Sequence, residues 1–188
     1  EFRRVLFRSG EGPGHRRDLE YLLGSTGVED VLRDHRLRFI DLNHDDVREV
    51  RLRSHYTGLT SMWLPATVLD ADLVVSLPKL KTHHWAGVTA SMKNFFGVVP
   101  GAVYGWPKNL LHLRGIEHAI VDLVATVRPA LTIVDGVTAM EGDGPIMGKP
   151  RPVGFIAMGT DRPAVDATLA RIVGFDPAKM PYLQLASA

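Results

Sequence analysis

Residues 70–101 read DADLVVSLPKLKTHHWAGVTASMKNFFGVVPG, and their pattern decides the predicted fold class. Asp72–Leu77 is a short apolar run of β-type residues that stops at Pro78, which is typical of a buried strand. A loop is expected after the proline. Apolar residues then recur every three or four positions, which predicts a helix over Val88–Val99. A buried strand, a loop and a helix in this order are typical of α/β proteins.

The same alternation continues towards the end of the chain. Apolar spacing predicts a helix over Asn109–Arg128, and Ala130–Asp135 repeats the buried-strand pattern. A loop, GVTAMEGDGPIMGKPRP, is expected before a strand over Val153–Met158 and a helix capped by Thr160 or Asp161. We therefore expect a single α/β domain with a mostly parallel sheet flanked by helices.

The N-terminal part predicts two short helices and two strands. The glycine-rich turn Gly10–Gly14 precedes a helix that starts near Leu19, and a second helix is expected over Val28–Asp34. Leu37–Leu42 is typical of a strand. The alternation in VREVRLR, residues 47–53, predicts a half-exposed strand.

The first nine residues, EFRRVLFRS, look like the translation of a sequencing adaptor. We therefore expect one partial domain over residues 10–188. Truncation is expected at the N-terminus and at the C-terminus. Without this segment the chain has 19 basic and 20 acidic residues, so its formal charge falls from +1 to −1. The balanced charge argues against nucleic acid as a partner.

Composition excludes several kinds of site. The chain has no cysteine, which excludes disulfides, thiolate zinc sites and an iron–sulfur cluster held by this chain. The absence of cysteine is compatible with a reducing compartment, and we expect a cytoplasmic protein. No apolar run approaches the length of a membrane span, so no membrane partner is expected.

Between Asp72 and Glu117 the chain has 44 residues without an acidic side chain. Lysines remain there at ordinary density, so the local charge is positive. Several polar residues follow the end of the predicted strand or lie on the next helix, and ligands of α/β sheets bind at such strand ends. These predicted ligand-binding residues are Lys79, Lys81, His83, Lys93 and Asn94. They suit a phosphate or carboxylate, although solvated lysines on an ordinary surface are the plainer alternative.

Three carboxylates are candidate catalytic residues. Asp135, Glu141 and Asp161 follow predicted strands, and they are candidates for acid–base groups if the strand ends converge. With His83, His84 and Asp143 they are also candidates for a metal site if the strand ends converge, but two adjacent imidazoles alone make a poor cage, and whether a metal binds stays open.

Two glycine-rich segments are candidate parts of the same site. Gly142 and Gly144 are expected in a flexible loop over the ligand or in an ordinary surface loop, because their spacing does not fit a dinucleotide-binding fingerprint. The turn Gly10–Gly14, followed by Arg16 and Arg17, is either an anion cradle or a simple turn.

Three segments of the chain resemble the successive signature blocks of the domain of unknown function 362 family. They are DADLVVSLPKLKTHHWAGVTASMKNFFGVVPG, RPALTIVDGVTAMEGDGPIMG and TDRPAVDATLARIVG. The resemblance implies one shared site formed by Lys79, Lys81, His83, Lys93, Asn94, Asp135, Glu141, Gly142, Gly144, Pro145, Asp161 and Asp166. Many relatives also carry a ferredoxin-type domain with iron–sulfur clusters. The family has no settled activity, so the resemblance implies a fold and a site but no reaction or cofactor.

Two functions follow from these observations. The first is an enzyme domain that binds a small phosphate- or carboxylate-bearing ligand at the lysine, histidine and asparagine residues. The alternative is a non-catalytic accessory protein that docks a ferredoxin-like, iron–sulfur redox partner through the basic stretch.

Overall fold

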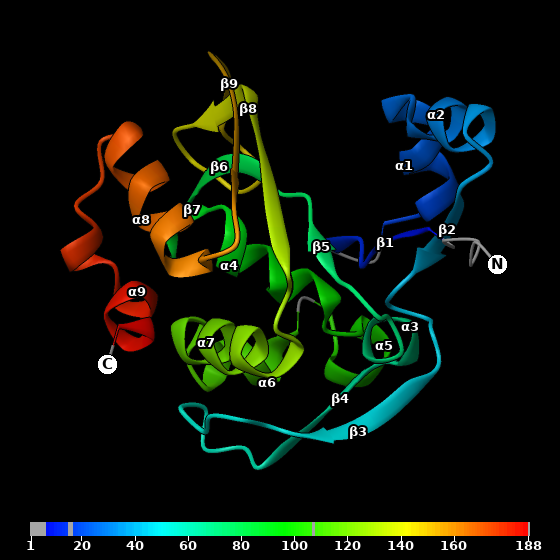
Figure 1. The fold of residues 1–188 in the computed structure, drawn as a ribbon, viewed down its shortest axis with the longest axis horizontal. Coiled ribbons are helices and arrows are strands. Elements are labelled where there is room, and N and C mark those ends of the chain that lie inside the picture. The colour runs from blue at the N-terminus through cyan, green and yellow to red at the C-terminus, as the bar shows by residue number, and fades with distance from the viewer. Residues whose placement is uncertain (1–6, 15–16, 107, 188) are drawn as a thin grey trace, which may run out of the picture.

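The computed structural model describes residues 7–14, 17–106 and 108–187 (Figure 1). The strands of this part are β1 Arg8–Glu11, β2 Arg38–Asp41, β3 Val47–Arg51, β4 Ser61–Pro65, β5 Val75–Ser76, β6 Lys79–His83, β7 Gly87–Thr89, β8 Leu131–Glu141 and β9 Lys149–Gly159. The α-helices are α1 Leu19–Thr26, α2 Val28–Asp34, α3 Ala66–Leu69, α4 Ser91–Asn94, α5 Gly101–Tyr104, α6 Asn109–Leu113, α7 Ile116–Val127, α8 Arg162–Ile172 and α9 Pro181–Ala186. Short 3-10 helices are η2 Phe95–Val98 and η3 Pro177–Lys179.

The central sheet contains β5, β6, β7, β8 and β9. Strands β5 and β6 follow one another along one edge of β8 and run parallel to it, while β9 pairs with the other edge in the antiparallel sense. Strand β7 returns antiparallel to β6. Three of the five strands therefore share one direction, and the α/β fold with a mostly parallel sheet is confirmed.

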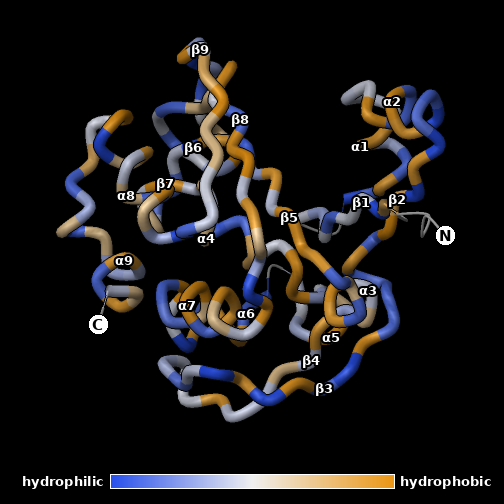
Figure 2. Tube along the Cα trace, viewed as in Figure 1, coloured by the Kyte–Doolittle hydropathy of each residue, from blue (hydrophilic) through white to orange (hydrophobic). Residues whose placement is uncertain are grey.

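The main core lies between this sheet and the helices α4, α7, α8 and α9. Val134 on β8, Ile120 on α7 and Tyr182 on α9 are fully buried. Helix α7 alternates between hydrophobic and hydrophilic residues along its length, as a helix with one buried side does (Figure 2). On the opposite face of the sheet Ile156 and Met158 of β9 are exposed.

The strands β1 and β2 form a separate two-stranded parallel pair, joined through α1 and α2. Figure 1 shows this unit beside the central sheet. Helix α1 buries none of its residues in the main core. The expected helices and the expected strand near residues 37–42 are confirmed here. Residues 1–6 of the suspected adaptor lie outside the described residues, while Arg8 and Ser9 pair with Arg38 and Phe39; the adaptor origin stays a prediction.

The segment after Pro78 differs from the expectation. Lys79–His83 is a strand and not a loop, because it pairs with β8 on one side and with β7 on the other. The predicted buried strand Asp72–Leu77 shortens to Val75–Ser76, and Leu73 and Leu77 are exposed. The predicted helix Val88–Val99 was wrong at its start, because β7 occupies Gly87–Thr89 before α4 and η2 begin.

Two further boundaries were wrong. The predicted helix Asn109–Arg128 is divided into α6 and α7 at Gly115, whose φ of 93° lies outside the helical range. The predicted long loop after Asp135 is largely strand, since β8 continues to Glu141 and pairs with β9 as a hairpin. A register shift between Gly136 and Thr138 lets the two strands stay paired over this length.

Candidate functional site

Five basic side chains from three segments converge in one place, which we call the basic cluster: Lys81, His83, Lys93, Lys108 and His112. The ring of Phe96 lies beneath two of them, with the Nζ of Lys93 at 4.6 Å and the Nζ of Lys108 at 5.6 Å from its centroid. Three of the residues were predicted as ligand-binding residues. Lys108 and His112 were not predicted, although both lie in the acid-free stretch.

Lys93 is positioned by a carboxylate that lies far away in the sequence. Asp166 of α8 accepts hydrogen bonds from the backbone N–H of Ser91 at 2.6 Å and of Met92 at 3.1 Å, and from the Tyr182 hydroxyl at 3.1 Å. It therefore caps the first turn of α4, which carries Lys93. Burial raises the pKa of Asp166 to about 7.

Lys108 is buried, and its backbone has a positive φ of 70°. Its Nζ donates to the backbone oxygen of Phe96 at 2.9 Å and of Gly97 at 3.3 Å. Burial lowers the pKa of Lys108 to about 8, and Glu11 opposes this effect. The lysine thus ties the segment before α6 to η2 and adds a buried charge to the cluster.

Burial and, after it, the neighbouring charges of Lys108 and Lys81 together lower the pKa of Lys93 to about 7. The pKa of Lys81 is also lowered by burial, while Glu11 raises it. Within the residues that the structure describes, none of these lysines forms an ion pair with a carboxylate. The cluster is therefore positive and only weakly compensated.

The hydrogen bonds of the two histidines in the cluster define their tautomers. Nδ1 of His83 accepts from the backbone N–H of Trp85 and of Ala86, both at 3.2 Å, so the proton of the neutral ring is on Nε2. Burial, followed by the charge of Lys93, lowers the pKa of His83 to about 3. Nδ1 of His112 lies 3.1 Å from the Lys108 carbonyl and must donate to it, which leaves Nε2 as an acceptor. One imidazole offers a proton and the other a lone pair.

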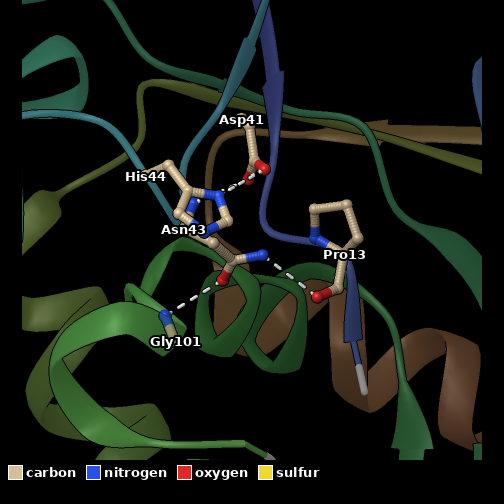
Figure 3. A network of polar contacts seen from close by, with 5 residues as sticks. All are labelled: Pro13, Asp41, Asn43, His44 and Gly101. Carbon is tan, nitrogen blue, oxygen red and sulfur yellow. Dashed lines mark hydrogen bonds and ion pairs between the residues drawn. The ribbon is translucent and has the colours of Figure 1, made fainter. Parts of the chain in front are cut away.

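The glycine-rich turn after β1 packs against the segment that carries the cluster. A Cβ on Gly12 would lie 2.5 Å from the carbonyl oxygen of Gly97, so only glycine fits this approach. The buried Asn43 amide donates to Pro13 O and accepts from Gly101 N, each at 3.0 Å (Figure 3). Arg16 lies outside the described residues. Sequence reasoning missed Asn43, because an asparagine after a strand has no distinctive pattern.

Each of the predicted catalytic carboxylates has its own partner outside the basic cluster. Asp135 forms an ion pair with Lys79, and this hydrogen bond lowers the pKa of the carboxyl group. Glu141 lies 3.8 Å from Arg151, and Asp161 caps α8 by accepting from Ala164 N at 2.9 Å. Their acid–base roles stay predictions.

The remaining predicted ligand residues also have partners. Nδ2 of Asn94 donates to the Ser76 hydroxyl at 3.0 Å. The Gly142 carbonyl accepts from the Thr82 hydroxyl at 2.9 Å, and the Gly144 carbonyl accepts from His84 N at 3.1 Å. The loop between β8 and β9 is therefore fastened to the end of β6.

Residues 7–171 match the model of a family described as Domain of unknown function (DUF362). The chain belongs to this family. A similar protein is the thylakoid-associated protein sll1697 of Synechocystis sp. (strain ATCC 27184 / PCC 6803 / Kazusa), which is 34% identical over 153 residues. The alignment covers 78% of this chain and 46% of that protein, so the chain spans less than half of the relative's length. No solved structure matches the chain.

Three observations limit what this DUF362 site can be. In the described part of the chain, no group of three His, Asp or Glu side chains is placed to hold a metal ion. Two hollows in the described surface lie elsewhere, one lined by residues that include Glu49 and Arg51 and one by residues that include Leu69 and Val127. Within the described residues, no helix combines the length and apolar character needed to cross a lipid bilayer.

Proposed function

We propose that this DUF362 domain is part of an enzyme and binds a small phosphate- or carboxylate-bearing ligand at the basic cluster. The observation that carries the proposal is the convergence of Lys93 and Lys108 over Phe96, with the charge of Lys81 acting on Lys93 and without an ion-paired carboxylate among the described residues. Holding like charges in a poorly hydrated place is unfavourable, and a bound anion would relieve that repulsion.

The burial of the charges favours a small ligand over a docked protein. Lys108 is buried and Lys81 and Lys93 are partly buried, so an ion small enough to approach closely can use them. The Nε2–H of His83 adds a neutral donor. Lys79, which is more exposed, is already paired with Asp135. Docking of a ferredoxin-like partner would instead use solvent-exposed lysines, because charges on the surface guide the association of two proteins.

Catalytic use of Asp135, Glu141 or Asp161 requires a ligand that extends beyond the cluster, because each carboxylate is held in a different contact. His112 is a nearer candidate for a base, since its Nε2 has a free lone pair. A cytoplasmic location stays part of the proposal, although the name of the Synechocystis relative associates that protein with thylakoids.

Titration calorimetry with inorganic phosphate, pyrophosphate and citrate at constant ionic strength tests the proposal. Lys81→Gln and Lys93→Gln are each expected to weaken binding by about tenfold, the effect of one charge-assisted contact. Lys179→Gln is the matched control, because Lys179 is exposed and its ion-pair partner among the described residues is Asp176, at 4.0 Å. Equal affinities in all variants would contradict the proposal. Salt-sensitive binding of an acidic ferredoxin, with no small-anion binding, would favour the docking alternative.

A further inference from the structure

We infer that Lys93 is a nucleophile that forms an imine with the carbonyl group of an anionic aldehyde or ketone. This inference rests on the proposed function and specifies its substrate class: the ligand carries a carbonyl group beside a phosphate or carboxylate. Lys81 would hold the charged group, and Lys93 would attack the carbonyl carbon.

The surroundings of Lys93 favour a neutral amine. Its Nζ lies over the same Phe96 ring as the Nζ of Lys108, at 4.6 Å and 5.6 Å from the centroid, so a second ammonium group is close to it. The ring face by itself attracts the charged amine, but burial and the neighbouring like charge oppose it. Among the described residues, no hydrogen bond from the Lys93 Nζ occurs. Burial, followed by the positive charges of Lys108 and Lys81, lowers its pKa to about 7. About half of the amine is then unprotonated at neutral pH, whereas an ordinary lysine is almost wholly protonated. Only the neutral amine has the lone pair that attacks a carbonyl carbon.

The two histidines offer the proton transfers that imine formation needs. The Nε2–H of His83 is a donor for the carbonyl oxygen as negative charge develops on it. The Nε2 of His112 is an acceptor for the proton that the attacking amine releases. The His112 ring packs against the same Phe96 ring as Lys93, with ring centroids 5.1 Å apart. Besides burial, the charge of Lys93 lowers the pKa of both His83 and His112.

The step balances without an oxidant or a reductant. The Nζ lone pair forms the new C–N bond and the carbonyl π electrons move to oxygen. One proton of the nitrogen passes by way of His112 to that oxygen, which becomes a hydroxyl group. The second nitrogen proton follows the same route, and the hydroxyl group leaves as water when the nitrogen lone pair forms the C=N bond. The net reaction joins the amine and the carbonyl compound and releases one water molecule.

Reductive trapping tests the inference. The full chain is incubated with glyoxylate and sodium cyanoborohydride, and labelled lysines are located by peptide mass spectrometry. Lys93 is expected to be labelled at least about tenfold faster than Lys179, because its neutral fraction is much larger. Its labelling rate should rise with pH through about 7. Butanal, which has no anionic group, should label Lys93 more slowly than glyoxylate.

Two variants distinguish nucleophilic attack by Lys93 from electrostatic binding of the anion. Lys93→Arg keeps the charge and should still bind phosphate, but should lose the label. His112→Asn keeps a side-chain N–H near the Lys108 carbonyl and removes the base, so trapping should slow while phosphate binding persists.

The outcomes distinguish this inference from the proposed function. Phosphate binding with labels distributed according to lysine exposure, or with no label, would overturn imine formation and leave anion binding standing. Absence of both phosphate binding and Lys93 labelling would overturn both.

Discussion

Lys93 and Asp166 are ionisable residues in places from which water is largely excluded. Burial lowers the pKa of the lysine to about 7 and raises that of the carboxyl group to about 7, because it disfavours the charged form of each. Their roles differ. Lys93 keeps part of its surface accessible, whereas Asp166 is fully buried and hydrogen-bonded to the segment that carries Lys93.

We predict that Asp166→Asn destabilises the protein and that the difference from wild type depends on pH. The folded-state pKa of Asp166 is above its unfolded value of about 3.9. Protonation of Asp166 therefore stabilises the folded wild type at low pH, and this stabilisation is lost as pH rises through about 7. Asparagine does not titrate and has one acceptor oxygen fewer. The loss in the free energy of unfolding caused by Asp166→Asn, about 1–3 kcal/mol, should therefore be larger at pH 5 than at pH 8.

Urea unfolding of both proteins at the two pH values measures this difference. A cost that is the same at pH 5 and pH 8 would contradict the raised pKa.

At the scale of elements, β6 and the loop between β8 and β9 are fitted closely together. Gly144 is buried, and a Cβ on it would lie 2.0 Å from the carbonyl oxygen of Thr82. The loop also accepts hydrogen bonds from Thr82 and His84. This loop holds the end of the strand that carries Lys81 and His83.

Gly144→Ala is expected to force the loop away from β6 and to cost about 1–3 kcal/mol, as overpacking in a close contact does. Gly14→Ala is the control, because a Cβ there meets nothing within 4 Å. Chemical denaturation gives the cost, and hydrogen exchange at Thr82–His84 reports the local separation. Unchanged exchange with unchanged stability would show that the contact is looser than described.

At the scale of the whole molecule, the β1–β2 unit and the central sheet do not share one continuous core. Leu32 and Leu42 are buried outside the main cluster of apolar side chains. Asn43 joins the two parts, because its amide bonds Pro13 after β1 and Gly101 at the start of α5 (Figure 3). The glycine-rich turn also approaches the central part directly, because Gly12 lies against the carbonyl oxygen of Gly97.

We predict that Asn43→Ala loosens the N-terminal unit more than the central sheet. The buried oxygen of Pro13 and the N–H of Gly101 would each lose a partner, at a cost of about 1–3 kcal/mol per group. Hydrogen exchange should accelerate in β1 and β2, while β8 and β9 keep their protection. The paired strands of the central sheet are the internal reference, and uniform acceleration in all strands would contradict the prediction.

Local patterns predicted much of the secondary structure. The helix capped by Asp161 and the strands near Arg38–Asp41 and Val153–Met158 were found because caps and apolar periodicity act over a few residues. The strand Lys79–His83 and the extension of β8 to Glu141 were missed, because their backbone partners come from distant segments. Apolar content alone does not reveal that pairing.

The sequence by itself determined the α/β class, the family and the 44-residue stretch without acids that contains the cluster's lysines and histidines. Only the tertiary structure decided which of those residues meet. It brought Lys108 and His112 to Lys81, His83 and Lys93, and it paired Lys79 with Asp135 instead. The physical reason is that charge density follows from composition, whereas burial, tautomer and pKa depend on neighbours that long-range packing supplies.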